Sequence, residues 1–229
     1  MSAAATRSKF TKQLDDIEEY LRRLDKLALI ASDVRAAGLA ATGDKGAAEG
    51  VMSGRKNEDR LRNAIEENCL DVMLLQQPLI GEDLRFVSGA FRIVSDLTHI
   101  DGMTRDIAFL VEEIPAKAAK KLTTEFTEMS ECAASMVEQA GAAFAASDVE
   151  GAQRVVEEDN RVNELYDEVE GKLVELIRAG KSSAQYLPEL LMVAKYFERI
   201  GDLAKRVAAW AIFRVTGEHV VAEKASQQR

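Results

Sequence analysis

The sequence contains few of the residues that interrupt helices. Its 229 residues include 14 glycines and 3 prolines, whereas average usage of about 12% would give about 27 residues of these two types. Aromatic residues, which favour strands, make up only 6% of the chain. Ala, Leu, Glu, Lys and Arg are abundant, and all of them favour helix. The composition predicts an all-α protein and argues against sandwiches, Rossmann sheets and other β-rich folds.

Cysteines and long apolar runs are also scarce. Cys69 and Cys132 are far apart and form no CxxC motif. We therefore expect two buried free thiols in a reducing cytosol. The N-terminal residues lack the apolar core of a signal peptide, and no segment approaches the roughly 18 apolar residues of a membrane span. These absences predict a cytoplasmic protein that does not insert into a membrane by itself.

Negative charge exceeds positive charge. The chain has 30 Lys and Arg residues and 39 Asp and Glu residues, which gives a formal net charge of −9. It contains no long Lys/Arg run that could offset this charge locally. Since such a field repels phosphate backbones, we expect no nucleic-acid partner.

Apolar residues recur at three- and four-residue spacing, which predicts long helices. A capping box at residues 147–150 and a second cap at Ser182 and Ser183 predict two of the helix starts. On the fifth predicted helix, apolar residues follow a seven-residue period that is typical of bundle packing. The helices are expected at residues 8–41, 47–77, 82–113, 116–146, 149–180 and 182–217.

The second half of the chain repeats the first at an offset of 100 residues. The offset aligns Glu58-Asp59 with Glu158-Asp159 and Asn63 with Asn163, and apolar classes follow in the same register over some fifty positions without a gap. This pattern indicates an internal duplication. We predict two tandem three-helix bundles, at residues 1–114 and 115–219, followed by a polar tail at residues 220–229.

The clearest polar group is a pair of carboxylates on the last predicted helix. Glu198 and Asp202 are four residues apart and therefore lie one turn apart on the same face. Because like charges at this spacing repel, a compensating cation is expected. Hard cations such as Mg²⁺, Ca²⁺, Mn²⁺ or iron prefer oxygen ligands. The alternative is a pair of solvated acids neutralised by Arg199 and Lys205.

Related positions on other helices carry fewer charges. Asp159 with Asn163, and Asp59 with Asn63, have the same four-residue spacing but only one carboxylate per pair. In the first repeat, Asp96 lies near two further polar residues, His99 and Asp101.

Catalytic motifs are missing. The chain has only two histidines, His99 and His219, and contains no GxSxG, Walker A or GxGxxG motif. Neither histidine follows a Glu by three residues, as di-iron carboxylate bundles require. We predict that the protein is not an enzyme.

Several ordered motifs resemble those of the PhoU family. The similarity covers about residues 8–219, and the duplication falls in the expected place. The motifs are LQQP at residues 75–78, DLR at 83–85, IVSDL at 93–97, DNRVNELYDEV at 159–169, ERIGD at 198–202, and Trp210 with the following VTGE at 215–218.

The resemblance implies a cytoplasmic regulator of phosphate uptake, built from two three-helix bundles and often dimeric. Such proteins act between the ATPase subunit of a phosphate ABC transporter and a sensor histidine kinase, and keep phosphate-starvation genes off when phosphate is sufficient. Partners would then bring the protein to the inner face of the membrane. The alternative from another class is a carboxylate bundle that binds or stores metal without a signalling role.

The resemblance also implies metal clusters at E/DxxxD motifs. Glu198 and Asp202 match the motif in full, while Asp159 with Asn163 and Asp59 with Asn63 match in part. Thr98 and Gly102 do not match, so the first-repeat site is expected to be either lost or rebuilt from Asp96, His99 and Asp101. The implied ions are divalent or ferric, with Mg, Ca, Mn, Fe and Zn not distinguished, or none where the motifs have lost their carboxylates.

Overall fold

The computed structural model describes residues 10–17, 19, 24–53, 58–75, 79–179 and 184–219, without the side chains of residues 24–26, 58–61 and 184. Helices and short turns make up these segments, and no strand occurs among them. None of the helices in these segments combines the length and the apolar character needed to cross a membrane. The prediction of an all-α protein is confirmed.

The first repeat contains four labelled helices. They are α2 (Leu24–Ala41), α3 (Lys45–Ser53), α4 (Glu58–Leu75) and α5 (Gly81–Glu112), and residues 10–17 are helical as well. The helix predicted at residues 47–77 corresponds to α3 and α4, and the four residues between these two lie outside the described segments. Both α3 and α4 pack on α5.

The second repeat contains the short α6 (Ala116–Ala119), α7 (Thr123–Ala146), α8 (Val149–Arg178), the 3-10 turn η1 (Ala184–Tyr186) and α9 (Leu187–Thr216). The prediction of one continuous helix at residues 116–146 was wrong. Leu122 has non-helical backbone angles (φ −112°, ψ 7°) and is fully buried. Burial of this apolar side chain offsets the loss of helical hydrogen bonds where the chain changes direction between α6 and α7.

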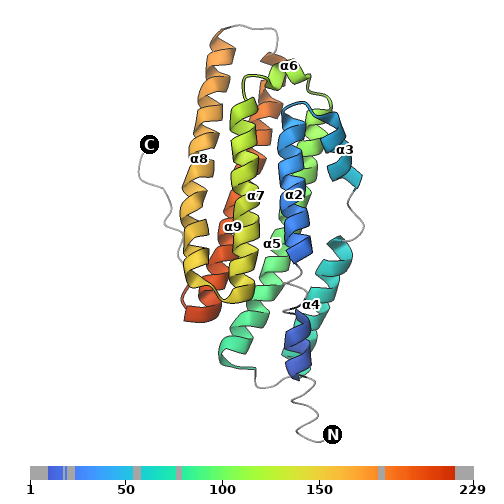
Figure 1. Ribbon diagram of the computed structural model, residues 1–229, viewed down its shortest axis with the longest axis vertical. Coiled ribbons are helices and arrows are strands. Elements are labelled where there is room, and N and C mark those ends of the chain that lie inside the picture. The colour runs from blue at the N-terminus through green and yellow to red at the C-terminus, as the bar shows by residue number, and fades with distance from the viewer. Residues whose placement is uncertain are drawn as a thin grey trace, which may run out of the picture.

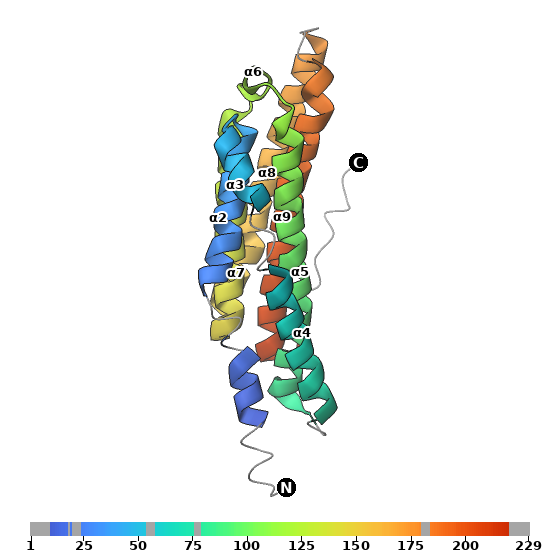
Figure 2. The same cartoon turned by 90° about the vertical axis from the view of Figure 1, so that its right-hand side faces the viewer.

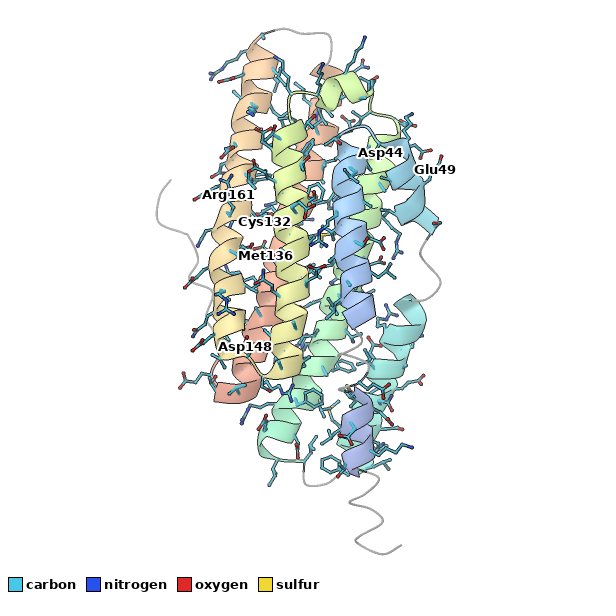
Figure 3. All side chains as sticks on the ribbon, in the orientation of Figure 1. Asp44, Glu49, Cys132, Met136, Asp148 and Arg161 are labelled. Atoms are coloured by element: carbon cyan, nitrogen blue, oxygen red, sulfur yellow. The ribbon has the colours of Figure 1, made fainter. Side chains whose placement is uncertain are left out.

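The turn between α7 and α8 differs by one residue from the predicted capping box. Ser147 adopts a left-handed conformation (φ 56°) and ends α7. The side chain of Asp148 then accepts a hydrogen bond of 2.9 Å from the Gly151 amide and begins α8; Figure 3 places Asp148 at this turn. The predicted cap at Ser182 and Ser183 lies outside the described residues.

Four helices form the centre of the molecule. Here α2 packs against α5 and α7, and α9 packs against the same two helices. The remaining long helix, α8, covers α7 and α9 from one side, whereas α3 and α4 lie along the opposite side of the molecule (Figure 1). Figure 2 shows that the helices run along the long axis, so the two bundles share a lengthwise interface.

The core follows the predicted periodicity. Val155, Val162 and Val169 repeat every seven residues on α8 and are fully buried, which confirms the bundle-facing stripe. Small residues allow close contact between the repeats. A Cβ atom placed on Gly38 of α2 would lie 2.0 Å from Ser130 Oγ of α7, so a larger residue at position 38 would clash.

Candidate carboxylate site

Carboxylates from two helices face each other in the second bundle. Asp159 of α8 is buried, with only 2% of its side chain exposed. Glu198 and Asp202 lie one turn apart on α9, and Gly201 stands between them. A Cβ atom on Gly201 would lie 3.5 Å from Asp159 Oδ1, which is ordinary van der Waals contact and shows that α9 packs directly on this carboxylate.

Lysine ammonium groups occupy the positions next to two of these carboxylates. Lys205 Nζ donates a 2.7 Å hydrogen bond to Asp159 Oδ2, and Asn163 Nδ2 donates to the same oxygen at 3.2 Å. Lys195 Nζ lies 2.6 Å from Glu198 Oε2 and 5.0 Å from the centre of the Tyr166 ring. The compensating cations at these two carboxylates are therefore side chains of the chain itself.

Asp202 lies in the negative potential of the two neighbouring carboxylates. Its side chain is exposed on one side, yet its pKa is raised, first by partial desolvation and then by the nearby charges of Glu198 and Asp159. Lys205 and Lys195 act in the opposite direction. Three carboxylates thus lie close to two ammonium groups, and the local charge is largely but not fully balanced.

The first repeat presents its predicted carboxylate to the other bundle. Asp96 of α5 has 7% of its side chain exposed, and both of its oxygens accept hydrogen bonds from Arg206 of α9, one of them from Nε at 2.8 Å. The neighbouring Asp101 is also buried and pairs with Arg105 one turn later on α5. His99 is exposed, whereas Asp96 is held in the interface between the bundles.

The other predicted positions offer fewer ligands. Asn63 is exposed, and the side chain of Asp59 lies outside the described residues. The Thr98 hydroxyl donates to the Val94 carbonyl within α5 at 2.9 Å. A Cβ atom on Gly102 would meet nothing within 4 Å. The structure therefore brings together Asp159, Asn163, Glu198 and Asp202, while Asp96 is separately paired with Arg206.

The donor set does not fit the metal ions that the resemblance implies. Asp159 Oδ1 is buried and accepts no hydrogen bond from the described residues. Its other oxygen carries Lys205, and both oxygens of Asp96 carry Arg206. In the described part of the chain, no group of three or more His, Cys, Asp or Glu side chains is arranged to hold a metal ion. A cation could reach Asp159 only through Oδ1, and a site that uses both oxygens of this carboxylate would require Lys205 to leave Oδ2.

The partners of two of these cations differ from those that the sequence predicts or cannot be predicted from it. The spacing on α9 predicts Lys205 as a partner of Glu198 and Asp202, but it bonds to Asp159 of the neighbouring helix. The role of Arg206 has no local signal. Its position directly after Lys205 is visible in the sequence, but the partner across the bundle interface depends on tertiary packing.

The comparisons with known proteins agree with the duplicated fold. A family model described as "PhoU domain" matches residues 24–111 and again residues 126–211. A relative from Aquifex aeolicus, named phosphate-specific transport system accessory protein PhoU homolog, is 32% identical over 216 residues, which cover 93% of this chain and 95% of the relative. A relative of the same name from Clostridium acetobutylicum is 28% identical over 177 residues, covering 77% of this chain and 81% of the relative.

Solved structures have the same fold. The crystal structure of PhoU from Pseudomonas aeruginosa superimposes with a TM-score of 0.80 at 23% identity and covers 91% of this chain and 100% of that one. The phosphate transport system regulatory protein PhoU from Streptococcus pneumoniae gives a TM-score of 0.78 at 23% identity, covering 93% of this chain and 99% of that chain. At these identities the likeness shows the fold of the two tandem bundles.

Proposed function

The chain belongs to the PhoU family, and we propose that it serves as an accessory regulator of a phosphate transport system. The observation that carries this proposal is the match of the family model to both halves of the chain. The Aquifex relative, whose name states such an accessory role, aligns over 93% of this chain and 95% of its own length. The shared part therefore includes both bundles.

The finer part of the proposal concerns the partners. We propose that the protein, as a homodimer in the cytoplasm, links the ATPase subunit of a phosphate ABC transporter to a sensor histidine kinase. In high phosphate it would hold the kinase in its non-activating state. The outer face of α8, a helix of 30 residues with exposed side chains along its whole length, supports this role because such a face can bind a partner helix.

The arrangement of polar groups favours binding over catalysis. Both His99 and His219 are exposed, and the His219 ring stacks on Phe213 at a centroid distance of 4.0 Å. The buried carboxylates Asp96 and Asp159 carry cationic side chains. Cations of the chain itself therefore neutralise these carboxylates, and this pairing argues against the alternative of a metal-storage bundle.

Deletion of the gene tests the regulatory proposal. We expect a deletion strain grown in high phosphate to express phosphate-starvation genes such as an alkaline phosphatase, and the full-length chain supplied in trans to restore repression. A variant with Phe197→Asp in the fully buried core provides a control that should not restore it. Continued repression in the deletion strain would contradict the proposal.

Capture of partners tests the finer part. The tagged full-length chain, purified from its own cells grown in high phosphate, is expected to retain a phosphate-transporter ATPase or a histidine kinase, identified by mass spectrometry. The same tag on an unrelated protein measures the background. Recovery of neither partner above that background, in cells where deletion does affect repression, would leave the regulatory role in place but contradict the bridging mechanism.

A further inference from the structure

Two consecutive residues of α9 hold two buried carboxylates in different bundles. Lys205 Nζ bonds to Asp159 Oδ2 of α8 at 2.7 Å, within the second bundle. Arg206 bonds to both oxygens of Asp96 of α5, across the interface to the first bundle. The side chains of the two acceptors are 2% and 7% exposed, so each carboxylate depends on a partner from α9.

A buried carboxylate requires a compensating cation. Removing it from water without one costs several kcal/mol or shifts its protonation. A metal ion can supply the positive charge, and so can an ammonium or guanidinium group at hydrogen-bond distance. At Asp159 the compensating group is the ammonium group of Lys205, and at Asp96 it is the guanidinium group of Arg206.

We propose that Lys205 and Arg206 act as built-in cations at the carboxylates where the family resemblance implies metal ions, so that this chain folds and keeps its two bundles joined without bound metal. The inference is independent of the proposed phosphate regulation, because it concerns only the contacts of α9 with α5 and α8. The two cationic side chains that make these sites unsuitable for a metal ion would thus have a structural role of their own.

The residues around each carboxylate agree with this assignment. Asn163 stands one turn after Asp159, where a second carboxylate would add a charged ligand, and its Nδ2 donates to the oxygen that Lys205 also contacts. In the first repeat, Thr98 and Gly102 stand where Glu198 and Asp202 stand in the second. Neutral groups thus stand beside the built-in cations at positions where the resemblance implies charged oxygen ligands.

The first experiment measures metal in the wild-type chain. Full-length protein is treated with EDTA, then incubated with Mg²⁺, Ca²⁺, Mn²⁺, Zn²⁺ or Fe³⁺, desalted, and assayed by elemental analysis and thermal unfolding. We expect substoichiometric metal and a melting temperature that neither EDTA nor any of the ions changes by more than about 1 °C, since only a ligand that binds the folded state raises stability. Stoichiometric metal that Asp159→Asn removes would overturn the proposal.

The second experiment removes the built-in cation. In the double variant Asn163→Asp/Lys205→Met, a metal ion can replace the ammonium group and gains a carboxylate ligand. We expect the melting temperature of this variant to rise by several degrees with Mn²⁺ and to return with EDTA, as for a ligand at about 100 times its Kd. A folded double variant without any metal-dependent shift would overturn the proposal that Lys205 stands in the place of a metal.

Two further variants serve as controls. The first shows whether loss of any lysine from a buried pair confers metal dependence, and the second applies if Lys205→Met does not fold. Lys172→Met removes an ammonium group from the buried Glu125, a different pair between α8 and α7, and should confer no metal dependence. Asp159→Asn/Lys205→Met removes charge and counter-charge together. If Lys205→Met alone unfolds the protein, this neutral pair should restore folding, and its failure to do so would contradict the assignment of Lys205 as a compensating cation.

Discussion

The guanidinium carbon of Arg214, near the end of α9, lies 4.3 Å from the centre of the Phe86 ring, near the start of α5. The Arg214 side chain is only 8% exposed, and its Nη1 donates a 2.7 Å hydrogen bond to the Phe144 carbonyl of α7. The Phe86 and Phe144 rings stack on each other with their centres 5.9 Å apart. One buried cation thus joins helices of both repeats at one end of the molecule.

We predict that Arg214→Met lowers the free energy of unfolding by about 2–3 kcal/mol, measured by urea denaturation. Methionine retains apolar volume, but the variant loses the cation–π contact and the charge-assisted hydrogen bond, and leaves the buried Phe144 carbonyl with one donor fewer. Arg92→Met, at an exposed position of α5, serves as the matched control and should change stability by less than about 0.5 kcal/mol. Equal effects of the two substitutions would contradict the structural role of Arg214.

A second prediction concerns Gly38, where the close contact between α2 and α7 leaves no room for a side chain. In Gly38→Ala, the new Cβ would lie 2.0 Å from Ser130 Oγ and 2.4 Å from Ser130 Cβ. Overpacking of this kind typically costs about 1–3 kcal/mol, which exceeds the roughly 1 kcal/mol that alanine contributes over glycine inside a helix. We therefore expect a net loss of stability, seen as a lower urea midpoint.

Gly102→Ala provides the control for this substitution. Gly102 also lies inside a long helix, but its Cβ would meet nothing within 4 Å, so only the helix propensity should act and stability should rise by about 0.5–1 kcal/mol. The clash is specific to Ser130, so the effects of Gly38→Ala and Ser130→Gly should not add: Gly38→Ala should be less destabilising in a Ser130→Gly background than in the wild type, although the new glycine itself costs helix stability. Stabilisation by Gly38→Ala alone would show that α2 and α7 are not packed as closely as described.

Sequence periodicity was sufficient to predict the class of the fold and most helix positions. The seven-residue spacing of Val155, Val162 and Val169 depends only on local geometry, and all three are buried as expected. The break at Leu122 was missed, because the surrounding residues favour helix and only burial in the assembled core stabilises the non-helical turn. Local propensity carries no information about that burial.

The candidate site shows the same limit. The spacing of Glu198 and Asp202 correctly placed both on one face of α9, and the need for a compensating cation followed from their charge. The cation at Glu198 could have been assigned in the same way, because Lys195 stands three residues before it on α9 and its Nζ lies 2.6 Å from Glu198 Oε2. The cations at the two buried carboxylates could not. Lys205 bonds to a residue 46 positions away and Arg206 to one 110 positions away, and such pairings depend on the packing of α9 against α8 and α5.

The thiols of Cys69 and Cys132 should react slowly with alkylating reagents at neutral pH, and the rate should continue to rise at alkaline pH. Desolvation, reinforced by the neighbouring Glu158, raises the pKa of Cys132 to about 11, and burial raises the pKa of Cys69 to about 12. Because the thiolate is the reactive form, alkylation of Cys132 in a Cys69→Ser variant should accelerate by about tenfold per pH unit from pH 7 to 9.5 without a plateau.

Glu158→Gln tests the electrostatic part of this prediction. The Sγ atom of Cys132 lies 3.8 Å from Glu158 Oε1, so removal of the carboxylate should lower the Cys132 pKa and speed alkylation at pH 8. Gln153, an exposed residue of the same helix, offers a control in Gln153→Ala. A plateau of the rate near pH 8.5, or an unchanged rate in Glu158→Gln, would contradict the description of this thiol.

The final prediction concerns acid stability at the contact between the bundles. Arg35 of α2 donates from Nη1 and Nη2 to the two oxygens of Glu138 of α7, at 2.9 and 3.1 Å, and this hydrogen bonding lowers the pKa of Glu138. A carboxyl with a lowered folded pKa stabilises the protein above its unfolded pKa, near 4.3 for Glu, because protons then bind more readily to the unfolded chain. That contribution to stability is lost as the pH falls through the pKa that Glu138 has in the folded protein.

We therefore expect Glu138→Gln to destabilise the protein at pH 7 by about 1 kcal/mol or less, because both partners are partly exposed and solvent screens the pair. Glutamine resembles the protonated acid, so the difference from wild type should shrink below about pH 4.3 and vanish once Glu138 is protonated in the folded state. Urea titrations of both proteins between pH 7 and pH 3 measure this difference. A difference that stayed constant over the whole range would assign the effect of the substitution to packing rather than to the ion pair, and the Arg35–Glu138 contact would then contribute nothing to the acid sensitivity of the interface.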